Sequence, residues 1–287
     1  MHGVGPPLVT PFEENGDVDH GRLRELVAWV ENRGVDFLVP CGSNSEAELL
    51  TAAEREQVIE TVVEKASVPV LAGTGSPGLR ETRQATAAAA EAGADAALVV
   101  TPFYYDHDQE TLAAYYREVA EEAPLPVYLY SVPAYTGVRL APETVGELAA
   151  HPTVAGMKDS SGDIGEFVRT QRRVEGEFSL MIGSGSVLAQ ALDAGATGGV
   201  LALANVAPAQ SKRIFETHRE AGDAERARAL NADLVDLNRA VTAEYGIPGL
   251  KWAMRERGAP AGHLRAPHRE PDADAREHLA SLVAGLD

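Results

Sequence analysis

The chain has 287 residues, of which 45% are hydrophobic, so it can bury a large core and is not an intrinsically disordered protein. Its formal net charge of −18 at pH 7 argues against nucleic acid as a partner, because phosphate binding requires clustered lysine and arginine. No apolar run approaches a membrane span, residues 1–10 lack the pattern of a signal peptide, and the single cysteine, Cys41, cannot form an internal disulfide. We therefore expect an intracellular, cytoplasmic protein with no membrane partner.

The acidic residues are spread along the whole chain and do not form one acidic tail, and only four lysines occur. A high net charge keeps a protein surface hydrated and resists self-association, which is a property that halophilic proteins use. We therefore expect a source that lives at high salt.

Eight short apolar runs recur between the N-terminus and residue 202. Their length and their content of β-branched and aromatic residues are typical of buried parallel strands. They cover residues 5–9, 35–40, 68–72, 96–101, 127–130, 154–158, 178–182 and 198–202.

Amphipathic helical patterns follow each of these runs. Thr51 and Glu54 are spaced as a capping box at the start of one helix, and Gly34 and Gly93 stand just past helix ends, where a left-handed cap favours glycine. The alternation of strand and helix predicts a parallel sheet with helical crossovers, and eight such units predict an α/β fold of the (β/α)8 TIM-barrel type. An open doubly wound sheet is the alternative, but the chain lacks the glycine-rich phosphate turn of that fold. The helical patterns cover residues 19–33, 51–66, 81–92, 109–122, 141–150, 163–174, 187–194 and 208–221.

The last part of the chain has no strand pattern. Residues 224–243, 249–257 and 272–284 have helical patterns, and no low-complexity linker precedes them. We therefore expect a barrel over residues 1–222 and a helical extension over residues 223–287 that packs on it.

Active sites of such barrels form where the strands end, and Lys158 ends the sixth apolar run. One interpretation is a lysine that extends along the surface to solvent. The other is an amine nucleophile that attacks a ketone, because the resulting protonated Schiff base accepts electrons when a neighbouring C–C bond breaks. That chemistry requires no metal.

Two further groups follow neighbouring runs. Tyr130 ends the fifth run, where its phenol could transfer protons, although most buried tyrosines serve packing. Ser43 and Asn44 lie in a loop that leads towards a helix and could bind a carboxylate, although an ordinary polar turn explains them equally well.

Rival chemistries have weaker support. Gly73, Gly75 and Gly78 are not followed by the acidic residue of a dinucleotide-binding fingerprint, and the histidines show no metal-ligand spacing. We therefore expect neither a metal nor a cofactor.

Taken together, these segments resemble the dihydrodipicolinate synthase and N-acetylneuraminate lyase family of class I aldolases over nearly the whole chain. Residues 130–137, YSVPAYTG, are similar to the Y-N-x-P-x-x-T-G segment of that family. Residues 156–162, GMKDSSG, are similar to its G-[IV]-K-[DE]-[ST]-[ST]-G segment, which carries the Schiff-base lysine. Segments beginning at Thr10, Thr101 and Gly199 are also similar to family patterns.

The resemblance implies a role for each matching residue. Lys158 corresponds to the Schiff-base lysine that captures the pyruvate part of a 2-oxo acid, and Tyr130 to the proton-transfer tyrosine. Ser43 and Asn44 correspond to the carboxylate-binding positions, and Tyr104 to a tyrosine that some members place in the neighbouring subunit. Gly183 and Leu201 are expected to line the pocket. The family also implies a homotetramer built as a dimer of dimers.

Departures from the family pattern bear on the substrate. Asn44 replaces a hydroxyl residue and Ser45 a glycine, while Tyr135 stands where the synthases carry an arginine for the carboxylate of aspartate semialdehyde. Loss of that charged fork should weaken binding of this second substrate. We therefore expect Tyr135 to contact a neutral sugar acid, in an aldolase that cleaves 2-keto-3-deoxygluconate to pyruvate and glyceraldehyde. The alternatives are 4-hydroxy-tetrahydrodipicolinate synthase, a 2-keto-3-deoxy sugar-acid dehydratase, and a non-catalytic metabolite-binding barrel.

Overall fold

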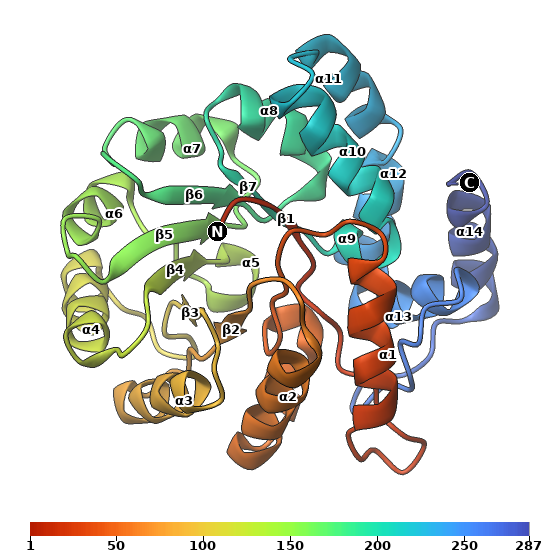
Figure 1. Cartoon of the computed structure of the whole chain (residues 1–287), viewed down its shortest axis with the longest axis horizontal. Helices are drawn as coiled ribbons and strands as arrows, with labels where there is room; N and C mark the ends of the chain where they lie inside the picture. The colour runs from red at the N-terminus through yellow and green to blue at the C-terminus, as the bar shows by residue number, and fades with distance from the viewer. Residues whose placement is uncertain (287) are drawn as a thin grey trace.

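The computed structural model describes residues 1–286, so Asp287, the last residue of the expected extension, lies outside the described residues. Within residues 1–286, seven strands form one parallel sheet in the order β1-β7-β6-β5-β4-β3-β2. Figure 1 shows the sheet with helices around its outside. The strands are β1 (Gly3–Gly5), β2 (Leu71–Gly73), β3 (Ala96–Val100), β4 (Val127–Ser131), β5 (Val154–Asp159), β6 (Ser179–Ile182) and β7 (Gly198–Val200).

The expected second strand, residues 35–40, does not form a continuous ladder. Leu38 makes a single parallel bridge to Val70, and Val39 makes one to Pro7. Pro6, Pro7, Pro40 and Pro69 flank these bridges and have no N–H to donate, which accounts for the interrupted pairing. The first strand is displaced for the same reason, because β1 ends where Pro6 begins. Residues 35–40 nevertheless lie between β1 and β2, the two ends of the sheet.

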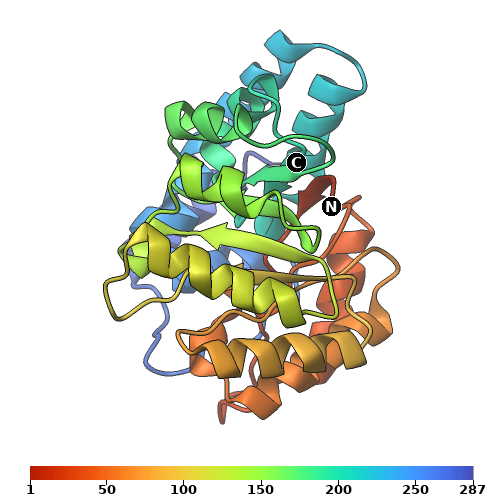
Figure 2. The same ribbon diagram turned by 90° about the vertical axis from the view of Figure 1, so that its left-hand side faces the viewer.

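Side chains of the strands alternate between two apolar clusters, as the period of a β-strand requires. On β3, Leu98 belongs to an inner cluster that also contains Phe37, Tyr130 and Met181. The adjacent Val99 belongs to the outer cluster, which lies between the sheet and the helices. In Figure 2 the helices of the yellow and green part of the chain lie on this outer face of the strands. The alternation places the Tyr130 side chain on the inner face of the sheet.

The expected crossover helices are present in the described chain, with ends within a few residues of the predicted ones. Thr51 and Glu54 form the expected capping box at the start of α2. Gly34 and Gly93 have φ of +83° and +92°, as expected after helix ends. These helices are α1 (His20–Glu31), α2 (Ala52–Lys65), α3 (Leu79–Glu91), α4 (Gln109–Glu122), α6 (Pro142–Leu148), α7 (Ile164–Gln171), α8 (Leu188–Asp193) and α10 (Pro208–Arg219).

Several short turns at the carboxyl ends of the strands were not expected from the sequence. They are too short for a periodic pattern, and they shape the loops in which the candidate site residues lie. They are the 3-10 turns η1 (Ser43–Ser45), η2 (Ala47–Leu49) and η3 (Gly185–Val187), and the short helices α5 (Pro133–Thr136) and α9 (Leu203–Val206).

The C-terminal part of the described chain is helical and packs on one side of the molecule, next to α1 and α10 (Figure 1). Its long predicted helix over residues 224–243 is divided into α11 (Ala224–Ala232), α12 (Val235–Arg239) and a π-helical turn, η4 (Ala240–Glu244). The chain continues with α13 (Gly246–Glu256) and α14 (Ala273–Val283). Among residues 1–286, no helix has both the length and the apolar character that a transmembrane span requires.

Candidate active site

Lys158 and Tyr130 lie side by side at the carboxyl ends of two neighbouring strands. Tyr130 of β4 pairs with Lys158 of β5 in the sheet register, and both side chains are buried. The Lys158 Nζ lies 4.1 Å from the centroid of the Tyr130 ring. A strand-end lysine that extended to solvent would be exposed, and Lys158 has only 3% of its surface exposed. The solvent-exposed interpretation of Lys158 is therefore wrong.

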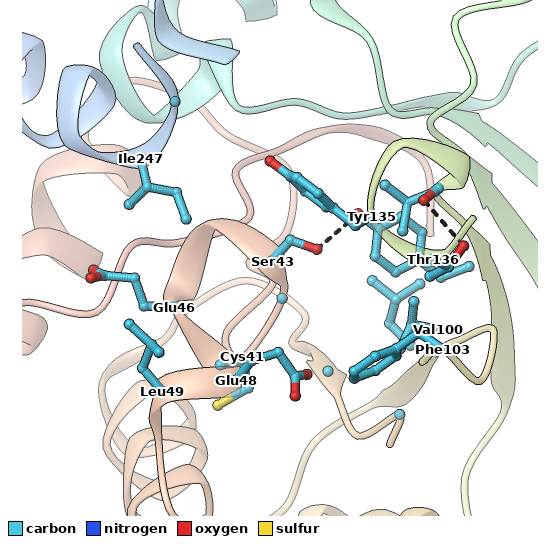
Figure 3. Close-up of a pocket in the computed structure, with 18 of the residues that line it drawn as sticks. Cys41, Ser43, Glu46, Glu48, Leu49, Val100, Phe103, Tyr135, Thr136 and Ile247 are labelled. Atoms are coloured by element: carbon cyan, nitrogen blue, oxygen red, sulfur yellow. Dashed lines mark hydrogen bonds between the residues drawn. The ribbon is translucent and has the colours of Figure 1, made fainter. Parts of the chain in front are cut away.

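The loop that follows residues 35–40 brings Ser43 next to Tyr130. The Ser43 Oγ is 3.2 Å from the hydroxyl oxygen of Tyr130, and Figure 3 shows this hydrogen bond. Ser45 anchors the loop, because its hydroxyl accepts a hydrogen bond from Gly42 N (3.1 Å) and its carbonyl accepts one from Thr10 Oγ1 (2.7 Å). The loop therefore has a defined conformation with Ser43 directed at the phenol.

A cavity of about 440 Å³ opens around Lys158, and we call it the lysine cavity. Its wall combines strand ends of β4 to β7 with the turn η4 of the C-terminal helices. Among residues 1–286, Lys158 is the only charged residue that lines it. The other polar lining residues are Asn44, Tyr130, Tyr135, Ser160, Ser184, Asn238 and Thr242.

Tyr130 and Tyr135 also line a second cavity of about 450 Å³, which we call the acidic cavity. It contains Glu46 and Glu48, and in Figure 3 the Glu48 carboxylate points into it. Cys41 is part of its wall, but burial raises the pKa of the Cys41 thiol to about 12, so the group is protonated at neutral pH. A protonated thiol is a poor nucleophile, and Cys41 is therefore not a candidate for covalent chemistry.

Asn238 lines the lysine cavity although it did not stand out in the sequence. Its Nδ2 donates to Ser186 Oγ at 2.8 Å, while its buried Oδ1 has no hydrogen-bond partner within residues 1–286. Asn231 lies seven residues earlier on the same side of the helical segment, where its side chain accepts from Ala189 N and donates to Gly185 O. Two buried asparagines at this spacing were the signal that could have identified the segment.

The other predicted site residues lie in different surroundings. Gly183 lines the lysine cavity, and a Cβ there would come within 1.8 Å of Ser160 Oγ. Leu201 is fully buried in the outer cluster and is not among the lining residues of either cavity, whereas its neighbours Val200 and Ala202 line the lysine cavity. Strand alternation accounts for this difference.

Tyr104 lies on the surface of the chain. It is 87% exposed, has a φ of +80°, and packs edge-to-face on Tyr105, with ring centroids 5.0 Å apart. A left-handed φ is uncommon for a residue other than glycine and holds Tyr104 in an unusual orientation. Tyr104 is not among the residues that line the lysine cavity within residues 1–286.

Among residues 1–286, no group of three or more histidine, cysteine, aspartate or glutamate side chains is arranged to hold a metal ion.

Comparison with known families matches residues 1–285 to the dihydrodipicolinate synthetase family. An uncharacterised DapA-like lyase of Halobacterium salinarum is 40% identical over 288 aligned residues, which cover 100% of this chain and 94% of that protein. A 4-hydroxy-tetrahydrodipicolinate synthase of Haloarcula marismortui is 35% identical, with 100% of this chain and 94% of that protein covered.

Solved structures are similar over the same length. The crystal structure of dihydrodipicolinate synthase from Aquifex aeolicus has a TM-score of 0.94 and 31% identity, covering 99% of this chain and 97% of that one. YagE of Escherichia coli K12, solved in complex with pyruvate, has a TM-score of 0.94 and 29% identity, covering 100% of this chain and 98% of that one. The likeness includes the C-terminal helices.

Proposed function

Since the chain belongs to the dihydrodipicolinate synthetase family, whose members are carbon–carbon lyases, we propose that it is a class I aldolase for a 2-keto-3-deoxy sugar acid. The substrate of first choice is 2-keto-3-deoxygluconate, which the enzyme cleaves reversibly to pyruvate and glyceraldehyde. Neither a metal nor a cofactor takes part in this proposal.

The chemistry begins at Lys158. Its amine attacks the C2 ketone, water leaves, and a protonated Schiff base forms. Loss of the C4 hydroxyl proton then breaks the C3–C4 bond, releases the aldehyde and leaves an enamine, whose electrons came from the broken bond. Protonation at C3 and hydrolysis return pyruvate and the free amine.

Tyr130 and its hydrogen-bonded partner would move the protons. The Tyr130 phenol lies beside Lys158 and shares a hydrogen bond with Ser43 Oγ, so it can give a proton to the leaving hydroxyl and take one from C4–OH. Ser43 and Asn44 would bind the carboxylate through their side chains and the N–H groups of η1.

The observation that carries the choice of substrate is the neutral wall of the lysine cavity. A carboxylate on the aldehyde half would meet no fixed cation there other than Lys158 itself. A polyhydroxylated half would meet hydroxyl and amide groups of the cavity wall, to which the side chain of Asn238 belongs. Ser160, Ser184 and Thr242 supply the remaining polar surface.

The second candidate is 4-hydroxy-tetrahydrodipicolinate synthase, which condenses pyruvate with aspartate semialdehyde. It is favoured by two relatives, 35% and 36% identical to this chain, that are 4-hydroxy-tetrahydrodipicolinate synthases. Purified protein given 2-keto-3-deoxygluconate should release pyruvate, measured with a coupled lactate dehydrogenase. Faster turnover of pyruvate with aspartate semialdehyde would establish the synthase instead, and release of a dehydrated keto acid without pyruvate would establish a dehydratase.

The alternative of a non-catalytic barrel has its own test. Treatment with pyruvate and borohydride should add the mass of a reduced pyruvyl group to the peptide that contains Lys158. A native mass for that peptide, with pyruvate present in excess, would favour a binding protein over an enzyme.

We also propose that the enzyme is a homotetramer in which a second copy covers Tyr104. Support comes from the paired exposed rings of Tyr104 and Tyr105, because large exposed aromatic groups usually mark an interface. Light scattering of the purified protein should give four times the mass of the chain. A monomer at assay concentration would refute this part of the proposal.

For the fold, we propose that residues 35–40 close the sheet as the eighth strand of a barrel over residues 1–222, with residues 223–287 as the packed extension. Support comes from the N–H groups of Leu38 and Val39, which donate to Pro69 O (2.9 Å) and Pro6 O (3.1 Å). Both amides should exchange slowly with deuterium. Fast exchange of both would indicate an open edge.

A further inference from the structure

A buried ion pair lies behind the loop that carries Ser43. The Lys251 Nζ is 2.6 Å from Glu46 Oε2, and both side chains are completely buried. Glu46 immediately follows η1, whereas Lys251 belongs to α13 in the C-terminal extension. The pair therefore joins the candidate carboxylate-binding loop to the C-terminal extension.

Within residues 1–286, the hydrogen bonds of the two side chains come from the C-terminal segment, and the Lys251 ammonium also lies 4.5 Å from the centroid of the Phe12 ring. Glu46 Oε1 accepts from the backbone N of Arg265 at 3.2 Å and lies 3.0 Å from His268 Nδ1. The Lys251 ammonium donates to His263 O at 2.7 Å. The carboxylate thus has two neighbours beyond its lysine, which is the condition under which a buried ion pair is tolerated.

Glu46 also connects the two turns of the loop, η1 and η2. Its φ is +55°, a left-handed value that costs energy for a residue other than glycine or asparagine. The turn before it ends with Glu46 N donating to Ser43 O at 3.2 Å, and the turn after it begins with Leu49 N donating to Glu46 O at 2.8 Å. A side chain held from outside the loop can maintain this conformation.

We propose that Glu46 and Lys251 are positioning residues that hold the Ser43–Ser45 turn in the conformation that binds the carboxylate of the 2-oxo acid. The inference rests on the proposed function, because it assigns that carboxylate to Ser43 and Asn44. It adds that the C-terminal extension determines the affinity for pyruvate although neither residue of the pair touches Lys158.

The measurement is the pyruvate concentration that gives half-maximal borohydride trapping at Lys158, followed by mass spectrometry. In Glu46→Gln and in Lys251→Met, this concentration should rise about tenfold, because either change removes the ion pair that holds Glu46, while the maximal trapped fraction is unchanged. Lys212→Met is the matched control, because it also removes a lysine that forms ion pairs, with Asp36 and Glu216, at the opposite ends of the strands. It should leave the half-saturating concentration unchanged.

The double variant Glu46→Gln with Lys251→Met separates positioning from stability. It leaves no unpaired buried charge, so its melting temperature should exceed that of either single variant, while the half-saturating concentration stays about tenfold high. A double variant with the unaltered half-saturating concentration would overturn the proposal.

His268 provides a test that does not disturb the buried pair, because its side chain is partly exposed. His268→Leu removes a neighbour of Glu46 and should raise the half-saturating concentration about threefold, whereas His268→Gln keeps a donor and should restore it. Equal values for the two variants would contradict positioning. If the unaltered protein gives no adduct at any pyruvate concentration, the proposed function itself fails, and that result differs from an adduct with unchanged affinity in the variants.

Discussion

The Lys158 amine lies over the ring of Tyr130 and not at its hydroxyl, with 4.1 Å between Nζ and the ring centroid. The Tyr130 hydroxyl can therefore form a hydrogen bond with Ser43 Oγ, at 3.2 Å. The Lys158 amine and the Tyr130 hydroxyl thus have different neighbours. This arrangement separates the nucleophile from the proton carrier while keeping both on the inner face of adjacent strands. Because both residues lie within paired strands of one parallel sheet, small movements of loops cannot separate them.

Tyr130→Phe should lower kcat for aldol cleavage about 10²-fold, since it removes the proton-transfer group but leaves Lys158 in place. Steady-state kinetics with the sugar acid measure the effect. Tyr128→Phe is a matched control on the same strand and the same face, with its hydroxyl 2.5 Å from the amino group of Met1 at the other end of the strand. An unaltered kcat in Tyr130→Phe would show that Tyr130 serves packing only, and equal losses in both variants would show that the effect is not specific to the site.

Tyr135→Arg should improve the use of aspartate semialdehyde. Tyr135 lines both cavities and is 64% exposed, so an arginine can be accommodated there and can supply the missing cation. The KM for aspartate semialdehyde should fall about tenfold in the condensation with pyruvate. Val168→Arg adds the same charge at an exposed residue of α7 that is not among the lining residues of either cavity, and it should not change that KM.

Asn238→Leu should weaken binding of the sugar acid without changing the capture of pyruvate by Lys158. The substitution conserves approximate size but removes the amide from the cavity wall, together with the donor to Ser186. The KM for 2-keto-3-deoxygluconate should rise about tenfold, equivalent to about 1.4 kcal/mol, while the half-saturating pyruvate concentration for trapping at Lys158 is unchanged. A parallel loss of pyruvate affinity would mean that Asn238 supports the whole cavity and does not select the substrate.

The sequence predicted the neighbourhood of Lys158 and Tyr130 because consecutive parallel strands pair, so residues that end consecutive apolar runs must meet. It predicted α4 with its bounds because Asp108 caps a regular amphipathic pattern. It did not predict the surroundings of Asn238 or the Glu46–Lys251 pair. Their partners come from distant segments, and a single chain contains no local pattern for such contacts.

The second strand shows a different limit of the sequence. Residues 35–40 have the apolar composition of a strand, but the prolines on either side remove the donors that a continuous ladder requires. The apolar composition therefore predicted the position of the segment correctly. The missing N–H donors of the prolines restrict its pairing to isolated bridges.

Stability at low pH should depend on Glu54. The hydrogen bonds from Arg265 hold the pKa of Glu54 at about 2, below its ordinary value of 4.5. The folded state thus favours the carboxylate, so its contribution is complete above pH 4.5 and is lost as pH falls towards 2. With allowance for solvent screening of this partly exposed pair, the loss is about 1–2 kcal/mol of unfolding free energy.

Glu54→Gln is the matched variant for this acid-dependent loss. It keeps the capping box with Thr51 but has no charge for Arg265. Urea melts between pH 5 and pH 2 should show a shallower decline for the variant than for the unaltered protein. Parallel curves would assign the acid sensitivity to other carboxylates.

Salt should stabilise this protein well beyond its effect on an ordinary enzyme. The net charge of −18 means that carboxylates repel one another over the surface, and the exposed arginine ion pairs contribute little to offset this. Because the Debye length falls to about 3 Å at 1 M, multimolar KCl should remove most of the repulsion, and the melting temperature should rise steeply from low salt to about 1 M and then more slowly. YagE of Escherichia coli, 29% identical with a TM-score of 0.94, is a suitable comparison in the same buffers. Equal melting temperatures in low and multimolar KCl would contradict adaptation to high salt, although relatives of the chain occur in Halobacterium salinarum and Haloarcula marismortui.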